Sequence, residues 1–279
     1  MKSIEAARVI KNIRSNFKAY MLTNKLQSIV IGISGGIDSS LCAVLLKPVM
    51  DNLHLPLIGV SLPASSNKLA EIERATIIGE QFCTKFHEQP ITVPFECLFE
   101  SIGAITDYFE LDIDTVPEHN FRIHMGNIKA RTRMTILYGL AGLYKGMVIS
   151  TDNLTEYYLG FWTLHGDVGD YGPIQNLWKT EVYEVARELL NELTSDKSLA
   201  LEAAIIANAT DGLGVSATTL EQLGGKTFKE VDTCLNSIIN HHACEFNPEV
   251  MEKIKTRHLN SQYKRTNPLN IPRELLFRE

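Results

Sequence analysis

A short glycine turn, Ser34-Gly-Gly-Ile-Asp-Ser39, constrains the fold of this chain more than any other segment. It follows the β-branched run from Ser28 to Ile33, which is typical of a buried parallel strand. It precedes an apolar stretch from Ser39 to Val49 with helical spacing. This order of strand, turn and helix predicts the first unit of a parallel sheet whose strands are joined by crossover helices.

The chemistry of the turn indicates a phosphate site. Glycines let backbone N–H groups approach an anion, and the helix that begins near Asp38 adds its positive end. The hydroxyls of Ser34 and Ser39 can also donate, and Asp38 is placed to hold Mg²⁺ beside the phosphates. A capped turn without a ligand is the alternative, but the combination of residues favours phosphate binding over it. No Gly-Lys-Ser/Thr ending is present, so the turn is not a Walker A loop. The candidate residues are Gly32, Ile33, Ser34, Gly35, Gly36, Ile37, Asp38 and Ser39.

Short apolar strand patterns alternate with helical patterns along the first two thirds of the chain. This alternation predicts an α/β fold with a doubly wound parallel sheet flanked by helices. We expect a single domain over residues 1–279, with a flexible loop near 208–225 and a C-terminal tail over 262–279. The expected strands are 28–33, 57–62, 91–94 and 146–150, and the expected helices are 4–17, 39–49, 69–86, 95–109, 127–144 and 179–193.

Composition excludes several classes of protein. The net charge of −6 over 279 residues argues against bulk nucleic-acid binding. No stretch approaches the roughly 18 apolar residues that suggest a membrane span, and the charged segment from Met1 to Tyr20 does not resemble a signal peptide. The five cysteines are dispersed and lack Cys-x-x-Cys spacing, which favours reduced thiols over disulfides or metal ligands. We therefore expect a cytoplasmic protein without a nucleic-acid or membrane partner.

Two further segments carry residues that suit a nucleotide. The segment from Gly126 to Met134 contains Arg131, whose guanidinium suits a phosphate or carboxylate, although a solvated basic helix face is the alternative. A second segment follows the strand at 146–150, and ligands of doubly wound sheets collect at such carboxyl ends. In it, Thr151 is a candidate nucleotide contact and Glu156 a second Mg²⁺ carboxylate. A capped helix start with a solvated glutamate is the alternative there.

A glycine-rich loop from Gly160 to Gly172 carries Asp167 and Asp170 and is followed by Lys179. Aspartates in such a loop can bind a ribose, an amide donor or a cation, or can simply form turns. His165 lies in the same loop, where a lone histidine is more often a structural hydrogen-bonding group than a general base. The loop is therefore a candidate for the second substrate of the site.

Taken in this order, the segments resemble the ammonia-dependent NAD synthetase family, within the N-type ATP pyrophosphatases. The resemblance extends from about Ile29 to Arg265. The family usually reads Gly-Ile-Ser-Gly-Gly-x-Asp-Ser, then Gly-Asn-x-x-Ala-Arg-x-Arg-Met, then Gly-Thr-Asp with a following Glu, then Gly-x-Phe-Thr-Lys-x-Gly-Asp. Several matches in register are far more specific than one. The resemblance implies an adenine nucleotide alpha hydrolase-like fold and ATP-dependent amidation of nicotinate adenine dinucleotide through an acyl adenylate.

The same resemblance implies roles for individual residues. The turn from Gly32 to Ser39 would bind the ATP phosphates, with Asp38 and Glu156 on Mg²⁺. The implied partners are ATP, a pyridine nucleotide, free ammonia and a second copy of the chain. The implied ATP contacts beyond the turn are Thr151, Lys179 and Thr210. The implied catalytic residues are Asp38, Asp167, Asp170 and Lys179, and the implied acceptor-binding residues are Arg131, Asp170, Tyr263 and Lys264.

Departures from the family pattern fall mainly on the acceptor side. Leu164 stands where the family has a lysine, and Tyr263 where it has a histidine. Ser150 replaces the glycine that usually precedes Thr-Asp, and Thr219 and Leu220 replace an acidic pair. Nicotinate mononucleotide or another carboxylate is therefore the alternative acceptor.

Two other functions are weighed against this one. An ATP pyrophosphatase that thiolates tRNA or amidates a purine would share the turn, but the acidic charge weighs against the tRNA version. A non-catalytic nucleotide-binding protein would not need Asp38, Glu156 and Lys179 together. No amidotransferase domain and no cysteine nucleophile with an evident partner are found, so free ammonia is the expected nitrogen source.

Overall fold

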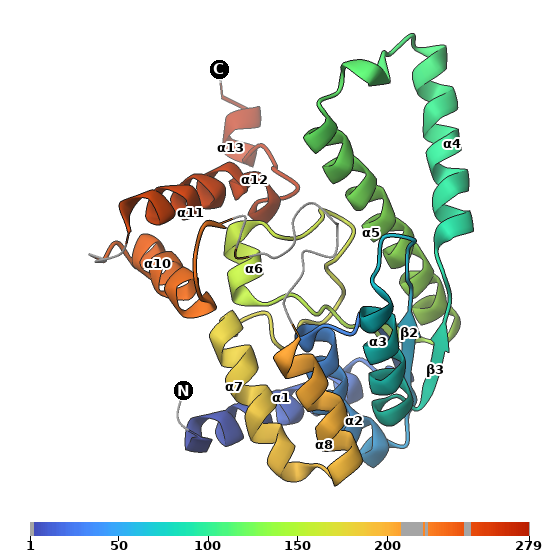
Figure 1. Ribbon diagram of the computed structural model, residues 1–279, viewed down its shortest axis with the longest axis vertical. Coiled ribbons are helices and arrows are strands. Elements are labelled where there is room, and N and C mark those ends of the chain that lie inside the picture. Colours follow the sequence, from blue (N-terminus) through green and yellow to red (C-terminus); the bar gives the residue numbers. More distant parts are fainter. Residues whose placement is uncertain (1–2, 208–219, 221–222, 243–246, 279) are drawn as a thin grey trace.

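The computed structural model describes residues 3–207, 220, 223–242 and 247–278 (Figure 1). Its sheet has four parallel strands in the order β3-β2-β1-β4. These are β1 (Ser28–Gly32), β2 (Leu57–Ser61), β3 (Lys85–Glu88) and β4 (Gly146–Val148). The order confirms the expected α/β fold with a doubly wound parallel sheet.

The register of the sheet sets the position of the site. Ile29 pairs with Leu57 of β2 on one side and with Met147 of β4 on the other. Strand order therefore reverses between β1 and β4, and a crevice opens beyond their carboxyl ends at such a reversal. The turn at Ser34-Gly35-Gly36 follows β1 directly and so lies at this crevice.

Helices cover both faces of the sheet because the strand side chains alternate between two cores. Ile29 and Ile31 face one core, which also receives α1 (Ser3–Thr23), α2 (Ile37–Leu53), α3 (Leu69–Phe82), α7 (Lys179–Leu189) and α8 (Ser195–Ile206). Val30 and Val148 face the other core, which is closed by Met134 and Leu137 of α5 (Glu118–Leu143). The 3₁₀ turn η2 (Leu190–Glu192) joins α7 to α8.

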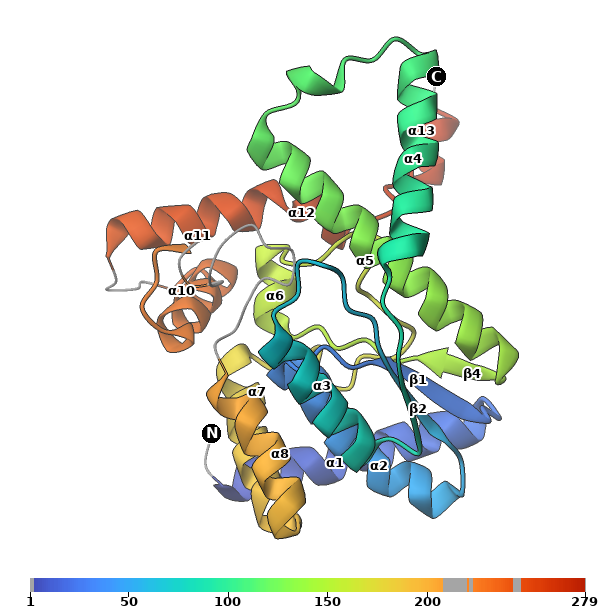
Figure 2. The same cartoon turned by 45° about the vertical axis from the view of Figure 1, so that its right-hand side comes forward.

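The helix α4 (Thr92–Tyr108) packs little against the rest of the protein. It runs with the first turns of α5 away from the sheet, and the two are joined through the 3₁₀ turn η1 (Ile113–Thr115) (Figures 1 and 2). No residue of α4 is buried, and every residue of this helix is described. Val93, Ile105 and Phe109 at its end are 55–68% exposed.

A third core lies apart from the sheet. It joins the short helix α6 (Leu154–Leu159) to α10 (Phe228–Asn240) and α11 (Pro248–Asn260) through Leu159, Leu235 and Ile254. The chain then continues into α12 (Gln262–Arg265) and α13 (Arg273–Leu276). No described helix is long and apolar enough to cross a membrane.

One predicted strand is wrong, and one strand of the sheet was not predicted. The strand expected at 91–94 is the start of α4, because Pro94 has no N–H for a strand ladder but fits the first turn of a helix. The third strand is instead Lys85–Glu88, which overlaps the end of the helix expected over 69–86. It pairs with β2, and Thr84 N–H donates to Leu57 O at 2.8 Å to start that pairing. The other predicted strands and helices are present with shifted ends.

Candidate active site

A cleft of about 900 Å³ lies at the carboxyl ends of β1, β2 and β4. Its wall combines the turn before α2, the β2–α3 loop, one face of α5, the β4–α6 loop, the start of α7 and the C-terminal helices. A volume of this size lies within the range of small-molecule sites, which extends from about 300 to 1,000 Å³. The residues predicted from the sequence that line it are Gly32, Ile33, Ser34, Gly36, Ile37, Asp38, Ser39, Arg131, Thr151, Glu156, Asp167, Lys179, Tyr263 and Lys264.

The turn after β1 has the geometry of an anion site. Gly36 is the N-cap of α2 and supplies no side-chain cap, so the first N–H groups of the helix are left for a ligand. The hydroxyls of Ser34 and Ser39 lie 3.0 Å apart, and Ser39 Oγ accepts from Ser34 N–H at 3.2 Å. Gly36 N–H donates to Ser34 Oγ at 3.3 Å. The serines therefore hold the loop in shape, and their hydroxyls could donate to an anion at the turn.

Gly35 is required by the backbone and by its neighbour α3. Its φ is +76°, and a Cβ there would lie 2.2 Å from Glu71 O. Arg74 Nε donates to Gly35 O at 3.1 Å and so fastens the turn to α3. Arg74 also lines the cleft, which brings a cation beside the phosphate turn. Gly35 itself is buried under α3 and acts through the shape of the turn.

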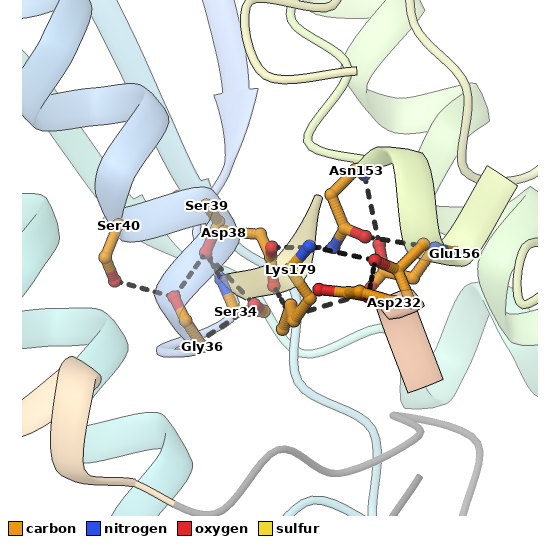
Figure 3. Close-up of polar contacts among 10 residues, drawn as sticks. Ser34, Gly36, Asp38, Ser39, Ser40, Asn153, Glu156, Lys179 and Asp232 are labelled. Carbon is orange, nitrogen blue, oxygen red and sulfur yellow. Dashed lines mark hydrogen bonds and ion pairs between the residues drawn. The ribbon is translucent and has the colours of Figure 1, made fainter. Parts of the chain in front are cut away.

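Lys179 binds two carboxylates that come from separate parts of the chain (Figure 3). Its Nζ forms a short ion pair with Asp38 Oδ2 and lies 3.4 Å from Glu156 Oε1. The lysine side chain is 4% exposed, against 18% for Asp38 and 26% for Glu156. Lys179 is therefore held at the base of the cleft and is more buried than either carboxylate.

Burial and charge shift the titration of this triad. Burial alone would lower the pKa of Lys179, but Asp38 and Glu156 outweigh it and raise that pKa. Burial raises the pKa of Glu156, and Asp38 adds to the rise while Lys179 opposes it. Lys179 therefore stays protonated at ordinary pH. A cation that arrives with a ligand near Glu156 would favour the ionised form of the Glu156 carboxyl.

Asn153 joins the triad to α6. As the N-cap of that helix, its Oδ1 accepts from Glu156 N–H at 3.0 Å, and Glu156 Oε2 accepts from Asn153 N–H at 3.3 Å. Its Nδ2 donates to Asp38 Oδ1 at 2.9 Å. One fully buried residue thus sets the position of both carboxylates, the Asp38 carboxylate through its side chain and the Glu156 carboxylate through its backbone N–H.

The residues at the base of the cleft fit a Mg²⁺ ion that arrives with a nucleotide. No group of three or more His, Cys, Asp or Glu side chains arranged for a metal occurs in the described part of the chain. Mg²⁺ usually keeps several waters and takes one or two carboxylates together with substrate phosphates. Asp38 and Glu156, beside the anion turn, supply such a pair.

The acceptor candidates line the outer part of the cleft. Arg131 Nε donates to Leu164 O at 3.2 Å, which leaves its terminal nitrogens for a ligand. Lys264 donates to the carbonyl oxygens of Gly160 and Trp162, at 2.7 Å to Gly160. Burial lowers the pKa of Lys264, with a further contribution from the charge of Arg257. The Lys264 ammonium thus already donates hydrogen bonds to the loop after α6, which leaves it less free to bind a ligand.

Asp167 is fixed by that same loop. It accepts a short hydrogen bond from Thr163 N–H, and Thr163 Oγ1 donates to Asn127 Oδ1 of α5 at 2.7 Å. Burial raises the pKa of Asp167, and the Thr163 N–H and the cation of Arg133 oppose that rise. Arg133 lines the cleft and donates to Leu62 O at 2.8 Å. These bonds hold the carboxyl at the cleft wall.

One predicted residue lies away from the cleft, because Asp170 is not among the described residues that line it. Its carboxylate accepts from Val148 N–H at 2.8 Å and from the Tyr138 hydroxyl at 2.9 Å, at the outer edge of β4. Thr210 lies outside the residues that the structure describes.

Two residues of the site were not singled out from the sequence. Asn153 donates to Asp38, and Arg74 donates to the phosphate turn. Arg133 belongs to the predicted basic segment at 126–134 and Asp152 to the segment after β4, and both line the cleft. Asp152 accepts from Ser150 Oγ at 2.6 Å. The position of Asn153 between Thr151 and Glu156 was the available signal, because small amides are frequent helix N-caps.

Comparison with known proteins identifies relatives over most of the chain. A family model described as NAD synthase matches residues 9–268. The NH(3)-dependent NAD(+) synthetase of Thermoplasma volcanium is 32% identical over 87% of this chain and 89% of that protein. That of Pyrococcus furiosus is 29% identical over 90% of both.

Solved structures show the same fold. A structure of NMN synthetase from Francisella tularensis has a TM-score of 0.77 at 24% identity, covering 96% of this chain and 98% of that chain. An NH3-dependent NAD synthetase from Campylobacter jejuni in complex with the nitrate ion has a TM-score of 0.71 at 20% identity, covering 97% and 99%. The arrangement of the sheet and its helices is therefore shared with both.

Proposed function

Because the chain belongs to the NAD synthase family of carbon–nitrogen ligases, we propose that it amidates nicotinate adenine dinucleotide to NAD, using ATP and free ammonia. The observation that carries the proposal is the buried Lys179 paired with Asp38 and Glu156 beside the turn at Ser34-Gly35-Gly36. Lys179 supplies positive charge for a nucleoside triphosphate, and the two carboxylates suit the Mg²⁺ that accompanies it.

The ATP half of the reaction is assigned to the turn and the triad. The open N–H groups of α2 and the hydroxyls of Ser34 and Ser39 bind phosphate oxygens. Asp38 and Glu156 would hold Mg²⁺, which would supply positive charge to neutralise the leaving pyrophosphate. Lys179 offers a cation to the phosphates, and Thr151 on the cleft wall contacts the nucleotide.

The chemistry proceeds in two displacements. The nicotinate carboxylate attacks the α-phosphorus, the bond to the bridging oxygen breaks, and pyrophosphate leaves. Ammonia then attacks the acyl carbon of the adenylate, loses a proton, and AMP leaves with the bonding electron pair. The protein contributes by orientation and by charge stabilisation, which together account for much of such a rate enhancement. Asp167, fixed at the cleft wall, is our candidate to bind ammonium. Asp170 is a candidate only through its support of the same loop.

The acceptor is assigned to the outer cleft, where Arg131, Tyr263 and Lys264 are available. Nicotinate mononucleotide is the second candidate acceptor, because Leu164 places an uncharged side chain on this wall. The NMN synthetase fold neighbour is consistent with that choice. A mononucleotide has one phosphate group rather than two bridged ones, so it needs fewer cations.

We further propose that the protein is a homodimer in the cytoplasm. The exposed apolar residues of α4 offer a surface that a second copy would cover. Replacing Ile105 with Glu should turn a dimer into a monomer in sedimentation equilibrium. A wild-type monomer would refute the dimer.

The proposed cytoplasmic location is supported by the cysteines. The free thiols at Cys42, Cys83, Cys97 and Cys234 fit a reducing compartment.

Pyrophosphate release tests the proposed function. Purified protein with ATP, Mg²⁺ and ammonium is offered nicotinate adenine dinucleotide, nicotinate mononucleotide, or neither. Release that depends on the dinucleotide supports the first choice, and release that depends on the mononucleotide supports the second. Release in the absence of both acceptors would refute the pyridine-nucleotide function. Failure of both acceptors to cause release would refute it as well. Asp38→Ala should abolish release with the fold intact by circular dichroism, and normal turnover would refute its role.

A further inference from the structure

The N-terminus of α7 is capped from a distance. Lys179 is the first residue of this helix, so its cation and the positive helix end lie together, which is unfavourable. The N-cap residue Trp178 forms no side-chain cap hydrogen bond. Trp178 N–H donates to Glu181 Oε2 at 3.0 Å, but the next two N–H groups need acceptors from elsewhere.

Asp232 of α10 supplies one of those acceptors. Its Oδ2 accepts from Thr180 N–H at 3.0 Å, and its Oδ1 accepts from Thr155 Oγ1 at 2.6 Å. Asp232 is 6% exposed, and Thr155 is 2% exposed. A buried carboxylate that caps a helix of another segment offsets the positive end of that helix.

Thr155 completes the connection. Its Oγ1 accepts from Lys179 N–H at 2.8 Å while it donates to Asp232. Thr155 belongs to α6, where the next residue is Glu156, and Lys179 begins α7. The hydrogen bonds therefore join α10, α6 and α7. Figure 3 shows Asp232 beside Lys179 and Glu156, the charged residues of α7 and α6.

The partners of Asp232 are distant in sequence. Thr180 is 52 residues before it and Thr155 is 77 residues before it. The third core packs α10 on α6 through Val231 and Leu159, which flank this network. The C-terminal helices are thus coupled to the base of the cleft by a packed core and by a buried polar network, and such networks fix geometry when all members are satisfied.

We propose that Asp232 is a positioning residue for the amidation reaction, acting through Thr155 and the α7 N-terminus to place Lys179 against the reacting phosphates. The inference rests on the proposed function for its kinetic part. Asp232 does not line the cleft among the described residues, so its effect is on the position of Lys179 rather than on the substrate. Loss of the cap lets the first turn of α7 move, and the Lys179 ammonium moves with it.

Two matched sets of variants separate position from packing. Asp232→Asn keeps the size of the side chain but removes the charge and one acceptor. Thr155→Val keeps the shape but removes the hydroxyl, and Thr155→Ser restores it. Thr233→Ala is the control on α10, because its exposed Oγ1 donates only to Lys229 O within the helix.

The kinetic test uses steady-state pyrophosphate release with the preferred acceptor. Because small misplacements of a catalytic group are costly, kcat should fall roughly tenfold or more in Asp232→Asn and Thr155→Val. The KM for the acceptor should stay near the wild-type value, and Thr155→Ser should regain most of kcat. Thr233→Ala should behave as wild type. Unchanged kcat in well-folded Asp232→Asn and Thr155→Val would overturn the proposal.

A second readout does not need turnover. Hydrogen exchange of the peptide that contains the Lys179 and Thr180 amides should be faster in Asp232→Asn than in wild type. Acylation of Lys179, followed by mass spectrometry, should also be faster. If wild type turns over no acceptor, the proposed function fails, and these two rates still decide whether Asp232 orders Lys179. If hydrogen exchange and acylation keep their wild-type rates in Asp232→Asn, the inference is overturned even if turnover falls, since the loss of turnover would then have another cause.

Discussion

Asn153 Nδ2 donates a hydrogen bond to Asp38 Oδ1 at 2.9 Å, across 115 residues of sequence. The same amide caps α6 through Glu156 N–H. The phosphate turn after β1 and the loop after β4 are thereby joined at the switch point of the sheet. Asp38 keeps its second oxygen for Lys179, so its orientation is determined from both sides.

The bond between Asn153 and Asp38 predicts a specific loss of activity. Asn153→Ser retains a good N-cap but has too short a side chain to cap α6 and also reach Asp38. We expect kcat for pyrophosphate release to fall roughly tenfold, equivalent to about 1.4 kcal/mol in the barrier. The Tm of the variant should change little, because serine also caps α6.

A matched variant controls for the cap itself. Asn247 caps α11 by accepting from Glu249 N–H at 2.9 Å, and it does not line the cleft among the described residues. Asn247→Ser should therefore leave kcat unchanged. Equal losses in Asn247→Ser and Asn153→Ser, or wild-type kcat in the latter, would contradict the proposed orientation of Asp38.

Removing the Lys179 cation should expose the repulsion between its partners. Lys179→Met keeps the length of the side chain but leaves Asp38 and Glu156 without a counter-charge. We expect the free energy of unfolding to fall by about 2–4 kcal/mol, at the lower end for a broken buried pair because the carboxylates are partly exposed. Millimolar Mg²⁺ should restore part of the lost Tm, since it can bind between the carboxylates.

The control for this prediction is an exposed pair of the same kind. Lys47 pairs with Asp51 on α2, and the Asp51 side chain is 57% exposed. Lys47→Met should change stability by at most about 1 kcal/mol, and Mg²⁺ should not rescue it. A similar Mg²⁺ effect on both variants would mean that the ion does not act at the triad. Calorimetry of each variant with and without MgCl₂ gives the comparison.

The sequence predicted the sheet where strands are uniformly apolar. β1, β2 and β4 are buried runs, and their order with the intervening helices was sufficient to predict the doubly wound fold. β3 was missed because Lys85–Glu88 is an edge strand with alternating exposure, and only Phe86 and Glu88 are half-buried. The apolar run at 91–94 therefore looked more like a strand than the true one.

The same limit applies to the site. Asp38, Glu156 and Lys179 each belong to a recognisable segment, and the structure brings them into contact. Asn153 and Asp232 act through bonds to residues far away in sequence, which no local pattern reveals. Physical chemistry predicts that buried polar groups have partners, but the partner is known only once the chain is folded.

Leu164 predicts a change in acceptor preference. It lines the cleft, and its carbonyl oxygen accepts from Arg131 Nε at 3.2 Å, so a lysine there would add an ammonium beside that guanidinium. A new charge-assisted hydrogen bond contributes about 1.5 kcal/mol, so Leu164→Lys should lower the KM for nicotinate adenine dinucleotide roughly tenfold. Leu164→Met, which adds length without charge, should leave that KM unchanged. An unchanged KM in both variants would exclude this position as the determinant of acceptor choice.

Asp152 predicts how stability depends on pH. It is 8% exposed, and burial raises its pKa well above the ordinary value, with repulsion from Asp167 adding to the rise and the Ser150 hydroxyl opposing it. The folded protein therefore keeps a proton on this carboxyl at pH values where the unfolded chain has lost it. Because the unfolded chain binds fewer protons in that window, the free energy of unfolding falls as pH rises.

The window begins near the ordinary carboxyl pKa of about 4. Glu156, whose pKa is raised to about 7, acts in the same direction and extends the window to neutral pH. Asp152→Asn removes one contributor, so its Tm should fall less steeply than that of wild type between pH 5 and pH 8. At pH 8 the Tm of Asp152→Asn should be higher than that of wild type by a few degrees, since about 1 kcal/mol corresponds to roughly 2–4 °C in a protein of this size.

Thermal unfolding at each pH measures both slopes, with Asp107→Asn on the exposed face of α4 as the control. Parallel curves for Asp152→Asn and wild type would show that Asp152 does not carry the raised pKa.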